Sequence, residues 1–203
     1  MYTREKDLRN SMQTTTKIIK KVAIFGDGEA RETDQHFKDA YEVAKLLAEN
    51  GYVVINGGGP GVMLSATLGA KAGGGKVEVV VMNPKIKIGN FEGESRENTS
   101  QADVRHETEN YDERVAKLAE VADAFVVFKG GTGTLSELGM VWSKAKFDFG
   151  HHEPIILFGK FWQEIIRVIE RDLGLEETEK RVIKIVEKPE EVIEGLKSTR
   201  AGN

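Results

Sequence analysis

The segment Val126–Trp142 places a strand, a glycine turn and a helix in direct succession. An apolar run over residues 124–128 is typical of a buried strand. It leads into the turn Gly130-Gly131-Thr132-Gly133-Thr134, after which apolar residues at helical spacing begin with Leu135. The first N–H groups of such a helix have no partner within it, and its dipole favours negative charge at that end. The segment therefore predicts an α/β unit that binds an anion such as phosphate.

Two further glycine clusters follow apolar runs. Gly57-Gly58-Gly59-Pro60-Gly61 comes after the run at residues 52–55, and Gly26-Asp27-Gly28 comes after the run at residues 22–25. Open parallel sheets build ligand crevices from loops at the carboxyl ends of their strands. We therefore predict a nucleotide-like ligand with a phosphate. The predicted contacts from these loops are Gly26, Gly58, Gly59, Gly61, Gly130, Gly131, Thr132, Gly133 and Thr134.

Strand and helix patterns alternate along the chain, which predicts an α/β fold with a doubly wound, mainly parallel sheet and helices on both faces. Residues 17–198 are expected to form one domain, and residues 1–16 a flexible or helical extension. Strands are expected at residues 21–25, 52–55, 76–81, 104–106, 124–128, 154–158 and 181–186. Helices are expected at residues 33–50, 111–121, 161–172 and 189–196, and after each glycine loop. Residues 83–103 read as a long loop.

Composition excludes several classes of function. The chain has no cysteine, so it forms no disulfide, has no catalytic thiolate and holds no cysteine-bound zinc. Its formal net charge of −4 argues against a general affinity for nucleic acid. No apolar run suggests a membrane span or a secretory signal, so we expect a cytoplasmic protein. The stretch His151-His152-Glu153 lacks a third ligand at metal spacing, so no metal site is predicted.

Glu137 follows Thr134 by three residues and is expected on the first turn of the helix. A carboxylate beside a phosphate site repels the ligand, which favours a catalytic role for it. An equally simple interpretation is that Glu137 complements the helix dipole and closes a capping box with Thr134 or Gly133. The pattern alone leaves both interpretations open.

Four stretches resemble the "lonely guy" family, and especially its bacterial nucleosidase branch. They are VADAFVVFKGGTGTLSEL, INGGGPGVMLSATLGAKAGGG, EPIILFGKFWQEII and VEKPEEVIEGL, and the resemblance covers residues 21–196. It implies a Rossmann-like fold and a homodimer or a multiple of one. It also implies cofactor-free hydrolysis of the N-glycosidic bond of a nucleoside 5′-monophosphate, such as AMP, to free base and ribose 5-phosphate.

The resemblance carries the catalytic roles to Glu137 and Arg114, and a substrate contact to Ser143. From its spacing alone, Arg114 would be a surface residue paired with Glu109 or Glu113. Val115 replaces a lysine of the family, and Asp27 stands where a small hydroxyl residue is common. These departures keep a second hypothesis open, in which the chain binds a nucleotide or a molybdenum cofactor without catalysis, as a carrier or sensor.

Overall fold

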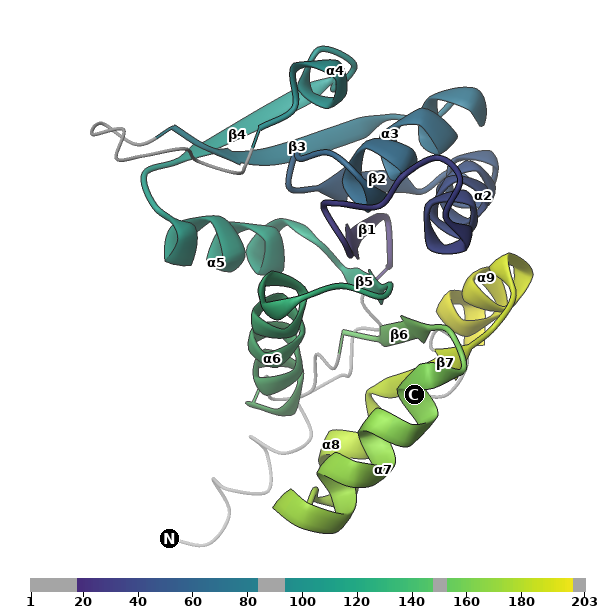
Figure 1. The fold of residues 1–203 in the computed structure, drawn as a ribbon, viewed down its shortest axis with the longest axis vertical. Helices are drawn as coiled ribbons and strands as arrows, with labels where there is room; N and C mark the ends of the chain where they lie inside the picture. The colour runs from purple at the N-terminus through teal and green to yellow at the C-terminus, as the bar shows by residue number, and fades with distance from the viewer. Residues whose placement is uncertain (1–17, 84–93, 148–152, 199–203) are drawn as a thin grey trace, which may run out of the picture.

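The computed structural model describes residues 18–83, 94–147 and 153–198, which form one seven-stranded sheet with helices packed against it (Figure 1). The strand order is β4-β3-β2-β1-β5-β6-β7, and every described pair of neighbours is parallel. The doubly wound α/β fold expected from the alternation of elements is therefore confirmed. The expected extension at residues 1–16 and the residues His151 and His152 lie outside the described ranges.

The strands are β1 (Lys21–Phe25), β2 (Val53–Asn56), β3 (Val77–Met82), β4 (Val104–Thr108), β5 (Ala124–Val127), β6 (Ile155–Phe158) and β7 (Ile183–Val186). The helices are α2 (Gln35–Glu49), α3 (Val62–Ala72), α4 (Arg96–Thr99), α5 (Tyr111–Val121), α6 (Thr132–Phe147), α7 (Phe161–Leu173), α8 (Glu177–Arg181) and α9 (Pro189–Ser198). The sequence pattern did not predict the short helices α4 and α8. Part of the loop expected at residues 83–103 falls outside the described residues, and its described end contains α4.

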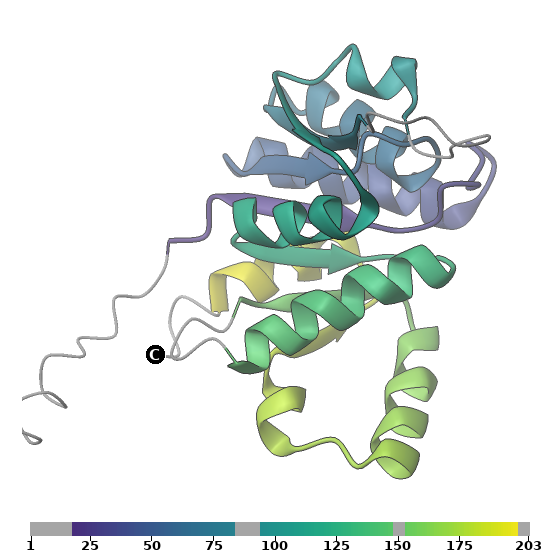
Figure 2. The same cartoon turned by 90° about the vertical axis from the view of Figure 1, so that its left-hand side faces the viewer.

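The central strands are buried on both faces because a helical layer covers each side of the sheet. Helices α2, α3 and α9 pack on one face, where alternate strand residues such as Val22 and Ile24 point. Helices α5 and α6 and the start of α7 pack on the other face, where Ala23 and Phe25 point. Figure 1 shows the two helical layers on either side of the sheet, and Figure 2 looks onto the layer of α5 and α6, with α7 and α8 extending beyond the edge of the sheet.

The direction of winding reverses between β1 and β5. From β1 the chain moves outward through β2, β3 and β4, and it then returns to place β5 on the other side of β1. At such a switch point the loops that follow the two strands turn to opposite faces and leave a crevice between them. The loops concerned are the β1 loop (Gly26–Gly28) and the second glycine loop (Gly130–Thr134).

Candidate active site

A cavity of about 790 Å³ opens at this switch point. Its volume is in the range of small-molecule sites. Of the residues predicted from the sequence, it is lined by Gly26, Arg114, Gly131, Thr132, Gly133, Thr134 and Glu137. The structure therefore gathers parts of two loops and two helices around a single space.

Backbone hydrogen bonds tie the three glycine-bearing loops together at Asp27. The N–H of Asp27 donates to the carbonyl of Lys129 at 2.9 Å, and the N–H of Val62 donates to the carbonyl of Asp27 at 2.9 Å. Gly61 makes this approach possible, because a Cβ there would lie 2.2 Å from the Asp27 carbonyl oxygen and its φ is +62°. The β1 loop is thus held between its two neighbours.

The second glycine loop presents the N-terminus of α6 to the cavity. The helix begins at Thr132, and its first i to i+4 hydrogen bond runs from the N–H of Leu135 to the carbonyl of Gly131. Thr132, Gly133 and Thr134 line the cavity at this end. Their N–H groups precede the first helical hydrogen bond, which makes this end of the cavity suited to an anion.

Glu137 lies in the second turn of α6, not in the first as expected from the sequence, because the helix starts as early as Thr132. It lines the cavity but is only 8% exposed, and it forms no hydrogen bond or ion pair with any described residue. The capping-box interpretation is therefore wrong. Burial raises the pKa of Glu137 to about 7, although the nearby Arg114 guanidinium acts in the opposite direction.

Arg114 is a buried residue rather than a surface one. Its Nε donates to the carbonyl of Val80 at 3.1 Å, and its Nη2 donates to the carbonyl of Gly57 at 2.9 Å. Glu113, the partner expected from spacing alone, instead bonds Asn110 and the N–H of Glu109 at the start of α5. The remaining guanidinium nitrogen of Arg114, Nη1, donates to no described residue and is available to a ligand.

Five predicted contacts do not line the cavity. Gly58, Gly59 and Gly61, in the first glycine loop (Gly57–Gly61), are buried behind the wall, and Ser143 is exposed beyond Glu137 on α6. Gly130 is packed against Thr134, where a Cβ would lie 2.1 Å from the hydroxyl oxygen. A direct contact of these five with a ligand stays a prediction.

The two departures from the family pattern have different consequences. Val115 is 1% exposed and does not line the cavity, so the position where the family has a lysine contributes no group to the cavity wall. Asp27 does line the cavity. Its Oδ1 accepts from the N–H of Glu29 at 2.9 Å, and its Oδ2 lies 3.3 Å from Nε2 of His36. Asp27 therefore places a carboxylate beside the predicted anion site.

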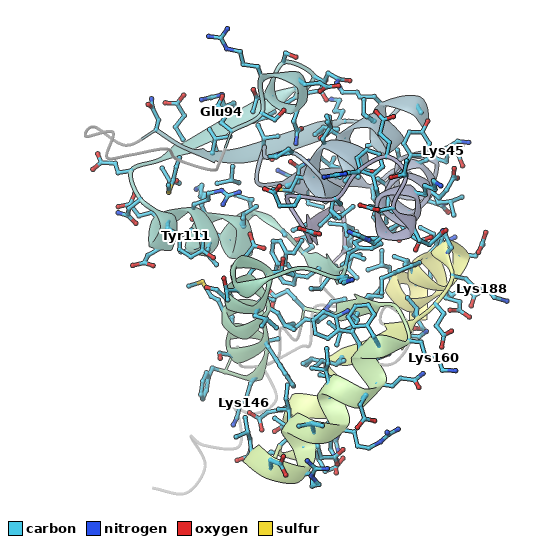
Figure 3. All side chains as sticks on the ribbon, in the orientation of Figure 1. Lys45, Glu94, Tyr111, Lys146, Lys160 and Lys188 are labelled. Carbon is cyan, nitrogen blue, oxygen red and sulfur yellow. The ribbon has the colours of Figure 1, made fainter. Side chains whose placement is uncertain are left out.

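Glu94 also lines the cavity, together with residues that the sequence did not predict, among them Pro60, Met63 and Tyr111. Figure 3 labels Glu94 and Tyr111, the latter at the start of α5. The Tyr111 hydroxyl donates to the carbonyl of Gly133 at 3.4 Å, across the cavity mouth. No periodicity marks such residues, since they share the cavity only through the arrangement of the strands.

The described residues also bear on metal binding and membrane insertion. Within the described parts of the chain, no group of three or more His, Asp or Glu side chains is arranged to hold a metal ion. In the same ranges no helix is both long and apolar enough to cross a membrane. The cytoplasmic location stays a prediction.

Known proteins resemble this chain in sequence. An uncharacterized protein of Archaeoglobus fulgidus is 30% identical over 141 residues, which cover 70% of this chain and 85% of that protein. A probable cytokinin riboside 5′-monophosphate phosphoribohydrolase of Oryza sativa subsp. japonica is 30% identical over 147 residues, covering 70% of this chain. The match spans only 54% of that rice protein, about half its length.

Solved structures share the fold at lower identity. The molybdenum cofactor carrier protein of Chlamydomonas reinhardtii superposes with a TM-score of 0.65 at 21% identity, covering 90% of this chain and 99% of that one. The molybdenum cofactor binding protein of Rippkaea orientalis gives a TM-score of 0.62 at 24% identity, covering 89% and 96%. These neighbours support the fold alone.

The family of this chain follows from a match to a known protein family. Residues 19–193 match the SLOG cluster4 family, and this matched segment contains the whole sheet, from just before β1 into α9. Together with the rice relatives, this match confirms the resemblance to the lonely guy family. On its fold, its cavity and this match, the chain belongs to the SLOG cluster4 family.

Proposed function

We propose that this chain is a hydrolase that cleaves the N-glycosidic bond of a nucleoside 5′-monophosphate and releases the free base and ribose 5-phosphate. One observation carries the proposal: a buried carboxyl group, Glu137, lies about one helical turn beyond the N-terminus of α6, in the same cavity as Arg114. Rice relatives named as phosphoribohydrolases support the same reaction class.

The positions of these groups follow the layout of a nucleotide. A phosphate on the N–H groups of Thr132, Gly133 and Thr134 would leave the attached ribose near the second turn of α6, because one turn rises 5.4 Å. Glu137 lies on that turn. The apolar wall of Pro60 and Met63, together with the ring of Tyr111, suits a planar base.

The chemistry needs little more than these groups. As the bond from C1′ to the base breaks, its electron pair leaves with the base and positive charge develops on the ribose. The ionised form of Glu137 stabilises that charge and takes a proton from the water that attacks C1′. Arg114, through its free Nη1, donates a hydrogen bond to the base or to the phosphate. The proton that Glu137 takes from the attacking water is returned through solvent to the departing base, so the hydroxyl of water ends on C1′, its proton ends on the base, and Glu137 is ionised again.

Incubation of the purified chain with AMP, GMP, CMP and UMP tests the proposal directly. We expect free base to appear with at least one nucleotide, and to disappear in Glu137→Gln. Binding of a nucleotide without release of base from any of the four would contradict the hydrolase and support the carrier hypothesis. A molybdenum cofactor carrier protein with the same fold is an example of that second function.

We also propose that the chain acts as a homodimer. The tryptophans do not support this: Trp162 is buried, and Trp142 is half-buried with its indole N–H donating to the carbonyl of Glu179 at 2.8 Å. The support comes from α6, where Leu135, Met140 and Phe147 are exposed. Exposed small residues, Ser136, Gly139 and Ser143, lie between them and permit close helix packing.

A further inference from the structure

Three polar side chains that are completely buried lie behind the first glycine loop. Asn56 ends β2, Thr67 lies in α3 and Asn98 lies in α4, and each has 0% exposure. Burying polar groups is unfavourable unless their hydrogen bonds are made, so a group of three requires a structural reason. None of the three lines the cavity.

The three side chains form a closed ring of hydrogen bonds. The Asn56 amide donates to the Thr67 hydroxyl at 2.9 Å, and that hydroxyl donates to Oδ1 of Asn98 at 2.6 Å. The Asn98 amide closes the ring by donating to Oδ1 of Asn56 at 3.1 Å. A fully paired ring of this kind is rigid, and removal of one member takes one ring hydrogen bond from each of the other two.

The ring also grips the backbone of the first glycine loop from behind. Nδ2 of Asn98 donates to the carbonyl of Gly59 at 2.7 Å, and Oδ1 of Asn56 accepts from the N–H of Gly58 at 2.8 Å. On the outer side, the N–H of Ser95 donates to the carbonyl of Gly58 at 2.9 Å. The loop is therefore held on both sides of Gly58.

The front of the same loop holds Arg114. The Gly57 carbonyl accepts from Nη2 at 2.9 Å, and the guanidinium lies so close to the Gly57 backbone that a Cβ there would be 1.8 Å from Nη2. The carbonyl can keep this position only if the loop behind it does not move. The path from Asn98 to the guanidinium runs through Gly59 and Gly57.

We infer that Asn98 and Thr67 are positioning residues that hold Arg114 in its working orientation through the first glycine loop. In this arrangement the first glycine loop binds and orients the Arg114 side chain, and the N-terminus of α6 is the anion site. This inference rests on the proposed function only for its effect on turnover. The effect on the Arg114 side chain is independent of any reaction.

The experiment follows the Arg114 side chain by proton–nitrogen correlation NMR, with its Nε–H and Nη–H signals assigned by their loss in Arg114→Lys. Asn98→Ala and Thr67→Val each break the ring, and the second keeps the side-chain shape. Val192→Ala is the control, because it removes core volume in α9, away from the cavity. In both ring variants we expect the Arg114 signals to shift and exchange faster with solvent, while the control leaves them unchanged.

Turnover provides the second measurement. A small displacement of a catalytic group costs on the order of a hundredfold in rate, so kcat should fall by roughly tenfold to a hundredfold in both ring variants. Unchanged Arg114 signals in Thr67→Val, or an equal change in Val192→Ala, would overturn the inference. Shifted signals in a chain that cleaves no nucleotide would support the positioning role while contradicting the hydrolase proposal. If Asn98→Ala fails to fold, Thr67→Val alone decides.

Discussion

Nη2 of Arg114 lies 2.9 Å from the carbonyl oxygen of Gly57, so close to the backbone that residue 57 has no room for a side chain. This contact joins a helix on one face of the sheet to a loop that follows β2. In the sequence, Gly57 looks like part of a phosphate-binding loop. In the structure its carbonyl oxygen accepts a hydrogen bond that orients the buried Arg114 side chain.

Gly57→Ala should therefore disable the site while leaving the fold intact. The new methyl group must displace the guanidinium, so we expect base release to fall by on the order of a hundredfold. The control is Gly195→Ala in α9, where a Cβ meets only the ends of the Ile156 and Lys184 side chains. Equal activity of the two variants would show that the Arg114 contact is not needed.

Glu137→Gln should stabilise the chain at alkaline pH. The folded pKa of about 7 lies above the ordinary value of 4.5, so the folded state favours the protonated form. The associated stability is present below about pH 4.5 and is lost as pH rises through 7. This difference between the folded and ordinary pKa values corresponds to roughly 3 kcal/mol in the free energy of unfolding. Urea unfolding at pH 5 and pH 8.5 should show the Gln variant gaining on the parent only at the higher pH.

Turnover should rise with pH through about 7 if the ionised form of Glu137 is the active one. The measurement is kcat against pH from 5.5 to 8.5, with Glu137→Asp for comparison. A rate that instead falls through this range would assign the proton-donating role to Glu137. In the Gln variant the residual rate should show no such step.

Asp27→Asn should tighten the binding of phosphate-bearing ligands. Asp27 lines the same cavity as the second glycine loop, and removal of its charge relieves repulsion while keeping Oδ1 as an acceptor for the Glu29 N–H. We expect several-fold stronger AMP binding at low salt, with the gain shrinking as salt is added. The control is Asp39→Asn, at a surface position of α2 outside the cavity, which makes the same change in net charge and should have no effect. Weaker AMP binding in Asp27→Asn would mean that Asp27 accepts a hydrogen bond from the ligand.

Leu135→Glu and Met140→Lys should separate the proposed dimer. Both side chains are exposed on α6, so the substitutions leave the core intact. Light scattering should give a dimer mass for the parent and a monomer mass for the variants at micromolar concentration. A parent chain that is already monomeric would rule out this use of the α6 surface.

The sequence by itself determined the order and direction of the elements. Apolar runs at residues 22–25 and 124–128 are buried on both sides, as their lack of polar alternation predicted. Glycine turns after these runs predicted the cavity edge correctly, because the carboxyl ends of parallel strands meet at one edge of the sheet. Glu137 was found because its spacing from the second glycine loop is a local property of one helix.

Only the tertiary structure decided which role each of the two glycine loops has. The two glycine loops, Gly57–Gly61 and Gly130–Thr134, look alike in sequence. In the structure, however, Asn98 donates a hydrogen bond to the carbonyl of Gly59, and Arg114 donates one to the carbonyl of Gly57. Arg114 is buried because α5 packs against β1, β3 and β4, which brings its guanidinium to the carbonyl of Gly57, a residue 57 positions earlier in the chain. The burial that raises the pKa of Glu137 likewise depends on elements far away in the chain.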